Sequence, residues 1–234
     1  MKLLCHLLAL IAFVQISSAQ DQGEVVAVVL GENIYRQGKG DAQGRIFGAL
    51  LKRYAEEQAI KPTEEELAAF IARTEIAQTK IASKTQKDLA EVTQQLAEPD
   101  LAPEKRAQLE AQKSNLERFQ KSQELITKAS SEEAEQIKKV QRRIAEDFVG
   151  RWKVNKALYD QYGGRIIFQQ AGPEPLDAYR DFLKAEEKRG SFKILDPQVE
   201  ADFWRYFTDE KMHVFTEDKN LLTTPWWLKA TPGE

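Results

Sequence analysis

The chain has 234 residues and a formal net charge of −3 at pH 7, with 34 lysines and arginines against 37 aspartates and glutamates. This mildly acidic balance lacks the basic footprint of nucleic-acid-binding proteins, so no nucleic-acid partner is expected. A chain of this length buries a sufficient core without disulfides. Its one cysteine, Cys5, has no second thiol with which to form an internal disulfide or a cysteine-based zinc site.

Residues 1–19 have the composition of a secretory signal peptide. Lys2 precedes the apolar run Leu3–Ile16, and small residues lead to Ala19, after which cleavage is expected. An uncleaved N-terminal anchor is the alternative. The run is short for a membrane span and no later run reaches that length, so we expect no integral membrane segment in the cleaved chain. The expected location is the periplasm, and cleavage also removes the cysteine, so no thiol nucleophile remains.

Two elements are predicted between the signal and residue 63. Glu24–Gln37 is a β-rich apolar run closed by Gly31, which predicts a short strand or extended segment. Gly38–Arg45 has three glycines without the spacing of a phosphate-binding loop, and we interpret it as a turn. Asp41–Ile60 carries apolar residues at helical spacing and predicts a helix.

Long antiparallel helices are predicted over residues 63–162. Thr63 begins a capping-box pattern, and no glycine or proline follows until Glu98–Pro103, where the chain is expected to fold back. A second run of helix-forming residues, 104–148, contains Ser130 and Ser131, either of which is able to cap a new helix. A narrow apolar stripe with heptad-like spacing follows these helices and favours a hairpin that projects from a core. Its members are Leu109, Leu116, Phe119, Ile126, Ile137, Val140, Ile144, Phe148 and Trp152.

Aromatic residues are frequent after Gly163. Arg165–Gln170 predicts a short strand, and Pro175 is placed to open a helix that runs to about Arg189. Ser191–Pro197 is expected to be extended, and a short helix is expected in residues 197–207. The predicted fold is therefore mainly α, with a helical core closed by the N- and C-terminal segments, a long projecting antiparallel helical hairpin and one or two short strands. Residues 20–234 are expected to form a single domain, with a long helical insertion at about 72–148.

The sequence offers no complete catalytic set. His213 is the one histidine beyond the signal, and it lacks the spacing of a metal site or the neighbours of a catalytic triad. Glu174 and Asp177 lie one helical turn apart, as a carboxylate pair of a hydrolase would, but acidic residues at a helix N-terminus also complement the helix dipole. The dipole role is favoured, so no enzyme activity, cofactor or metal is expected.

Three features are open to a binding interpretation. The basic side chains between Lys138 and Lys156 are interleaved with acids, which favours a solvated face with ion pairs over an anion-binding stripe. Trp226 and Trp227 are able to anchor a partner, although packing on the core is favoured. The loop Gln169–Pro175 is expected to seat the following helix, with a binding role for its glutamines as the alternative.

Two motifs carry a resemblance to a known family. One is the valine-rich strand with its glycine turn, EVVAVVLGENIYRQ, and the other is AIKPTEEELAAFI, in which Thr63 opens a helix. From Val25 to about Ile71 the chain resembles the start of the N-terminal domain of SurA-type periplasmic chaperones, with Leu30 where that family has asparagine. The resemblance implies N-terminal helices completed by a helix from later in the chain, and a chaperone function. Parvulin rotamase domains of that family depend on paired histidines, so no prolyl isomerase activity is expected here.

The leading hypothesis is a non-catalytic periplasmic chaperone that binds unfolded or outer-membrane client proteins through apolar and aromatic grooves. The alternative is a structural or assembly protein that forms a homodimer through its long helices. A third hypothesis is an enzyme with Glu174, Asp177 and His213 as its acid–base groups. The candidate binding residues are Tyr179, Phe182, Phe203, Trp204, Phe207, Gln169, Gln170, Trp226 and Trp227.

Overall fold

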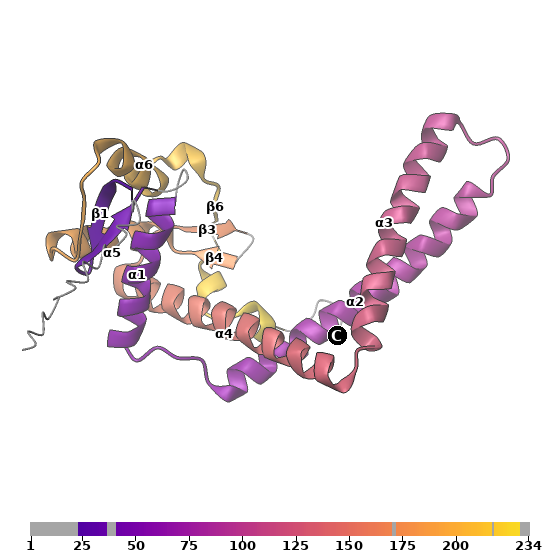
Figure 1. The fold of residues 1–234 in the computed structure, drawn as a ribbon, viewed down its shortest axis with the longest axis horizontal. Coiled ribbons are helices and arrows are strands. Elements are labelled where there is room, and N and C mark those ends of the chain that lie inside the picture. Colours follow the sequence, from indigo (N-terminus) through magenta and orange to yellow (C-terminus); the bar gives the residue numbers. More distant parts are fainter. Residues whose placement is uncertain (1–22, 37–40, 170–171, 217, 230–234) are drawn as a thin grey trace, which may run out of the picture.

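The computed structural model describes residues 23–36, 41–169, 172–216 and 218–229. Within these residues the fold is mainly α, with six α-helices and two three-stranded antiparallel sheets (Figure 1). The predicted fold class is confirmed, although the sheets contain six short strands rather than one or two. The predicted signal peptide, residues 1–19, lies outside the described residues.

The first sheet joins the N-terminal hairpin to a strand from the C-terminal third of the chain. Its order is β2 (Glu32–Tyr35), β1 (Val25–Val29) and β5 (Phe192–Ile194), all antiparallel. Leu30 and Gly31 both have positive φ, 52° and 84°, as a two-residue hairpin turn requires. The run predicted as one strand is therefore a hairpin. Leucine is rare at positive φ, so the sequence gives a weak signal for this turn.

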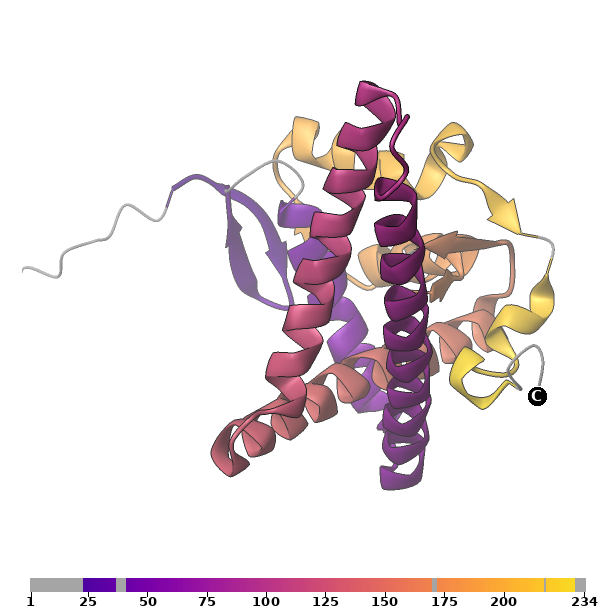
Figure 2. The same cartoon turned by 90° about the vertical axis from the view of Figure 1, so that its right-hand side faces the viewer.

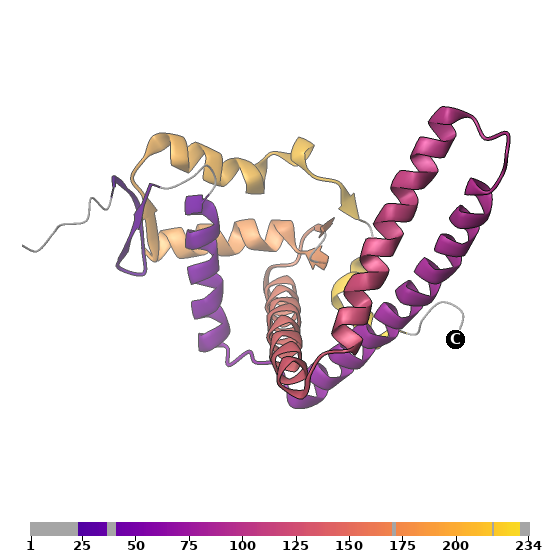
Figure 3. The same cartoon turned by 45° about the vertical axis from the view of Figure 1, so that its right-hand side comes forward.

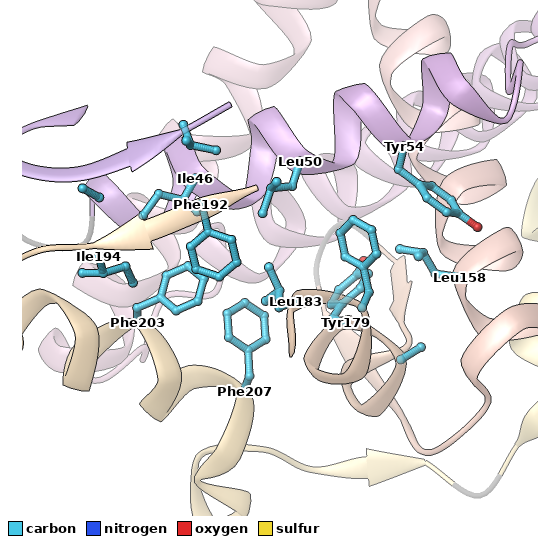
Figure 4. Packing of buried hydrophobic residues seen from close by; sticks show 14 of the residues in the cluster. Ile46, Leu50, Tyr54, Leu158, Tyr179, Leu183, Phe192, Ile194, Phe203 and Phe207 are labelled. Atoms are coloured by element: carbon cyan, nitrogen blue, oxygen red, sulfur yellow. The ribbon is translucent and has the colours of Figure 1, made fainter. Parts of the chain in front are cut away.

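The main hydrophobic core lies between this sheet and four helices. They are α1 (Asp41–Glu57), α5 (Leu176–Lys188), α6 (Pro197–Thr208) and the second half of α4 (Ser131–Tyr162). Figure 4 shows side chains from these elements and from β5 meeting in one interior. The N- and C-terminal segments thus close a common core, as predicted. The residues labelled in that view are Ile46, Leu50, Tyr54, Leu158, Tyr179, Leu183, Phe192, Ile194, Phe203 and Phe207.

Two long helices leave this core as an antiparallel hairpin. α2 (Glu64–Leu96) begins at the capping box of Thr63 and Glu66, and α3 (Pro103–Thr127) returns beside it after the turn at residues 97–102. Figures 1 and 3 show the hairpin leaving the core at an angle, and Figure 2 shows its two helices side by side. Beyond residue 72, the buried side chains described for these helices are Thr85, Val92 and Leu109, so the hairpin has a thin interior.

The third long helix, α4, connects the hairpin to the core. Ser130 caps it, and Glu133 completes a second capping box, so residues 104–148 form parts of two helices. Near the root of the hairpin, α4 crosses α2, where Arg142 bonds both carboxylate oxygens of Glu64 at 2.6 and 2.8 Å. Lys153 also contacts the carboxylate of Glu66 at 2.8 Å. The hairpin root is therefore attached to α4 by charged as well as apolar contacts.

A second sheet follows α4. Its order is β4 (Gly172–Glu174), β3 (Ile166–Gln169) and β6 (Phe215–Thr216). The predicted seating loop Gln169–Pro175 is therefore largely a β-hairpin. Pro175 precedes α5, as predicted, and Gly190, with a φ of 75°, follows its C-terminus.

Candidate binding surface

An exposed apolar strip runs along the outer face of α4. Val140, Ile144 and Phe148 are 58, 45 and 39% exposed, and their four-residue spacing places them on one face of the helix. Ala145 is fully buried on the face toward α2. Trp226, which is 42% exposed, extends the strip beyond Phe148. We call these four exposed residues, 140, 144, 148 and 226, the α4 strip.

The aromatic end of the strip is fixed by a small second cluster at the hairpin root. The ring of Phe70 stacks on Phe148 at 5.7 Å and meets the rings of Trp226 and Trp227 at 5.6 and 5.4 Å. Trp227 is only 5% exposed and also contacts Trp152 at 5.8 Å. Of the adjacent tryptophans, Trp227 therefore anchors the C-terminal segment and Trp226 presents a ring to solvent.

An open pocket of about 470 Å³ lies at the corner where α3 ends and α4 begins. Leu125 and Ile126, which are 67 and 51% exposed, contribute apolar side chains to it. Ile137 also lines the pocket and lies one helical turn before Val140, so the pocket continues into the α4 strip. The remaining lining residues are Ala129, Glu132, Glu133 and Gln136.

A second pocket, of about 310 Å³, lies between α2 and α3. Its lining is rich in hydroxyl and amide side chains, which are able to bond the backbone of an extended peptide. The lining residues are Thr79, Ala82, Ser83, Thr85, Gln86, Phe119, Gln120, Gln123, Glu124 and Thr127.

Ion pairs occupy much of the charged surface beside the strip. Lys138 bonds Glu135 at 2.8 Å, and Arg142 bonds Glu146 at 3.0 Å in addition to its contact with α2. These pairs fit the solvated face that the sequence favours. Arg151 differs, because it is exposed and forms no salt bridge within the part of the chain that the structure describes.

Four of the predicted binding aromatics are buried in the core. Tyr179, Phe182, Phe203 and Phe207 are 3, 1, 1 and 2% exposed. Their rings are therefore interior in this fold and present no surface to a client, and their role in binding stays a prediction that this burial disfavours. Trp204 is half-buried and rests on the ring of Phe203 at 5.2 Å. The sequence shows that these residues share helix faces, but it does not show which faces are covered.

The remaining predicted residues lie elsewhere. Gln169 ends β3 and is exposed, whereas Gln170 lies outside the described residues. Trp226 is exposed on the α4 strip, and Trp227 packs on the second cluster. Val140, Ile144 and Phe148 belong to the apolar stripe seen in the sequence. The sequence does not show that their side chains remain exposed to solvent in the folded chain.

Asp177 is committed to structural contacts. Its carboxylate accepts hydrogen bonds from the backbone N–H of Arg165 at 2.9 Å and from the Arg165 guanidinium at 2.8 Å. Arg180 donates another at 2.9 Å. Burial alone would raise the pKa of Asp177, but the hydrogen bonds from Arg165, with the charge of Arg180, lower it below its usual value.

Glu174 belongs to a separate buried network. The Tyr206 hydroxyl donates to its carboxylate at 3.2 Å, and burial raises the pKa of Glu174. Burial and the nearby Glu174 charge raise the pKa of Tyr206 to about 12. The Nε2 of His213 lies 2.6 Å from the Tyr206 carbonyl oxygen. Glu174 and His213 therefore both contact Tyr206, at its hydroxyl and at its carbonyl oxygen, whereas Asp177 is bonded by Arg165 and Arg180. None of the three groups lines the two pockets described above.

No family model, curated protein or solved structure matches this chain. The resemblance to SurA-type chaperones therefore stays a prediction. Among the residues that the structure describes, no helix has the length and apolar character to cross a membrane. In the same residues, no group of three or more histidine, cysteine, aspartate or glutamate side chains is placed to hold a metal ion.

Proposed function

We propose that the protein is a non-catalytic chaperone of the periplasm that holds extended or unfolded polypeptide segments on the α4 strip and in the corner pocket. The observation that carries this proposal is the set of exposed apolar side chains at the pocket between α3 and α4, Leu125 and Ile126, and on the α4 strip that follows it. Exposed apolar patches with polar surroundings are typical of interaction sites. The signal-like N-terminus and the resemblance to SurA-type chaperones support the location and the class of partner.

The surface has the chemistry for weak and broad recognition. Apolar contacts are non-directional, so one strip is able to hold many sequences. The amide-rich pocket between α2 and α3 offers donors and acceptors for a peptide backbone without selecting side chains. No reactive group is required for this function.

Suppression of aggregation tests the proposal. We expect wild-type protein in stoichiometric amounts to reduce light scattering by a urea-unfolded outer-membrane protein after dilution. The double variant Val140→Gln, Ile144→Gln removes two apolar side chains at exposed helical positions. Each exchange is expected to cost roughly 1 kcal/mol of binding, so the double variant binds about thirty-fold more weakly and about thirty-fold more protein is needed for the same suppression.

The matched control is Val214→Gln, because Val214 is 89% exposed and lies outside the strip. It is expected to behave like the wild type. No suppression by the wild type at several-fold molar excess, or equal loss in both variants, contradicts the proposal.

A homodimer through the same strip is the second candidate. The buried Leu109 lies inside the α2–α3 hairpin, so part of the heptad pattern is already used within one chain. The α4 strip is the unpaired apolar face that favours a second copy. Sedimentation at two concentrations separates the two candidates. A dimer that dissociates in the double variant Val140→Gln, Ile144→Gln supports assembly through the strip, and a monomer at both concentrations contradicts the homodimer.

A further inference from the structure

A small cavity lies beside the aromatic end of the α4 strip. It measures about 10 Å³, which is room for roughly one oxygen atom. It lies between α4, β4 and the C-terminal segment. Its wall includes Phe148, Arg151, Trp152, Gly172, Trp226 and Trp227.

Two residues of this wall carry a hydrogen-bond donor without an acceptor among the described residues. The Nε1 atoms of Trp152 and Trp227 are buried and form no hydrogen bond within the described chain. Buried indole N–H groups ordinarily have a partner, because an unmade hydrogen bond leaves the cost of their desolvation uncompensated. Asn155, which also lines the cavity, does not supply one, since its amide donates to the Pro173 carbonyl at 3.0 Å and accepts from the Tyr179 hydroxyl at 2.5 Å.

The charge at this cavity favours an anionic oxygen. Arg151 lines the cavity, is exposed and has no salt bridge within the described chain. The carboxylate of Glu174 is close enough for the Arg151 charge to act on its pKa, but it is bonded by Tyr206 and is not part of the wall. Three residues that line this space for one oxygen thus carry a guanidinium or an indole N–H without a bonded acceptor in the part of the chain that the structure describes, Arg151, Trp152 and Trp227, and such a donor set matches a carboxylate.

We propose that this cavity is a carboxylate seat: it takes one oxygen of a carboxylate on a bound polypeptide. The side chain beside that carboxylate packs on the exposed rings of Phe148 and Trp226, so an aromatic or large apolar neighbour is preferred. A role of this seat in client binding rests on the proposed function. Binding of a carboxylate to the seat is measured independently of that function.

Indole N–H signals in a nitrogen–proton NMR spectrum provide the direct test. The chain has four tryptophans, so four indole signals are expected, and Trp→Phe substitutions assign them. The probes are N-acetylphenylalanine, its neutral amide, and N-acetylaspartyl-phenylalaninamide. We expect the Trp152 and Trp227 signals to move downfield with the two acids, with at least ten-fold weaker binding of the neutral amide. The Trp204 signal is the internal control and stays in place.

The two acids are compared by their affinity. Tighter binding of N-acetylphenylalanine indicates that the seat prefers the carboxylate of a chain terminus, and tighter binding of the aspartyl compound indicates that it prefers the carboxylate of an acidic side chain.

The variant Arg151→Gln is expected to weaken binding of the acids about ten-fold while the signals keep their folded dispersion. Arg143→Gln, an exchange of another exposed arginine of α4, is the matched control and leaves the affinity unchanged. The proposal is overturned if the Trp152 and Trp227 signals do not move, if acid and amide bind equally, or if Arg151→Gln has no effect. If the indole signals move with the acids but the protein does not suppress aggregation, only the proposed chaperone function is contradicted. If the protein suppresses aggregation but the indole signals do not move, only the carboxylate seat is contradicted.

Discussion

At the scale of single residues, Asp177 joins the second sheet to the core helix α5. Its carboxylate receives hydrogen bonds from Arg165 at the start of β3 and from Arg180 one turn along α5. The guanidinium of Arg165 also lies 4.1 Å from the centre of the Phe215 ring on β6. Gly164 permits this approach, because a Cβ there would lie 2.4 Å from the Asp177 Cβ and its φ is 94°. The Asp177 carboxylate therefore connects α5 with the segment that enters β3, and Arg165 extends this connection to β6.

Asp177→Asn is expected to lower the free energy of unfolding by roughly 2–3 kcal/mol at pH 7, because Arg165 and Arg180 each lose one of their two acidic partners, the one that lies in a partly buried site. The pKa of Asp177 is lower in the fold than in the unfolded chain, so its contribution is complete above the ordinary aspartate pKa of about 3.9. That contribution is lost as the pH falls through the folded pKa. Urea unfolding at pH 7 and pH 3 measures both effects.

The control for this prediction is Asp181→Asn. Asp181 pairs with Arg180 at 3.1 Å, and its side chain is 44% exposed, so a loss below about 1 kcal/mol is expected. Equal losses in the two variants at pH 7, or a difference that persists unchanged at pH 3, would show that Asp177 is not the joining group.

Single residues also show where sequence reasoning ends. The position of Asp177 in the first turn of a helix predicts a favourable dipole interaction, and that position is correct. Its stronger partner, Arg165, comes from a strand whose place beside α5 depends on the whole fold. Similarly, Phe203 and Phe207 are recognisable as one helix face, but only the packing of α6 shows that this face is interior.

At the scale of secondary structure, local signals are the most informative. Capping boxes at Thr63 and Ser130 mark the starts of α2 and α4, and Gly190 marks the end of α5. Strand pairing was less predictable because it joins distant segments: β1 pairs with β5, which lies more than 160 residues later. The α4 strip was visible as periodic apolar residues, but the sequence alone does not separate a packed stripe from a free one.

The thin interior of the α2–α3 hairpin makes it sensitive to one substitution. Leu109→Ala is expected to cost about 2–3 kcal/mol locally, since Leu109 is 3% exposed and few other apolar side chains are buried there. Hydrogen exchange should therefore speed up in α2 and α3, while α1 and α5 keep their protection.

Leu125→Ala is the control, because Leu125 lies on the same helix and is 67% exposed. It should leave the exchange rates of the hairpin nearly unchanged. A uniform acceleration across the whole chain in Leu109→Ala would mean that the hairpin does not open separately from the core.

At the scale of the whole molecule, the N-terminal hairpin, α1, α5, α6 and the second half of α4 build a core, and α4 links this core to the α2–α3 hairpin. This core contains four aromatic residues that the sequence favours for binding, Tyr179, Phe182, Phe203 and Phe207. The exposed apolar surface lies where α3, α4 and the C-terminal segment approach the hairpin root. The residues that stabilise the fold are therefore different from those proposed to bind clients. Substitutions on the α4 strip are expected to change the binding surface without opening the core.

The most direct test of this account places a reporter on the strip. Ile144→Cys in a Cys5→Ser background gives one thiol for a polarity-sensitive fluorophore, and Val214→Cys in the same background gives the control. On addition of a urea-unfolded outer-membrane protein, the account predicts a saturable blue shift at position 144 and none at position 214. An unchanged spectrum at position 144, or the same shift at both positions, would contradict the claim that the α4 strip binds clients.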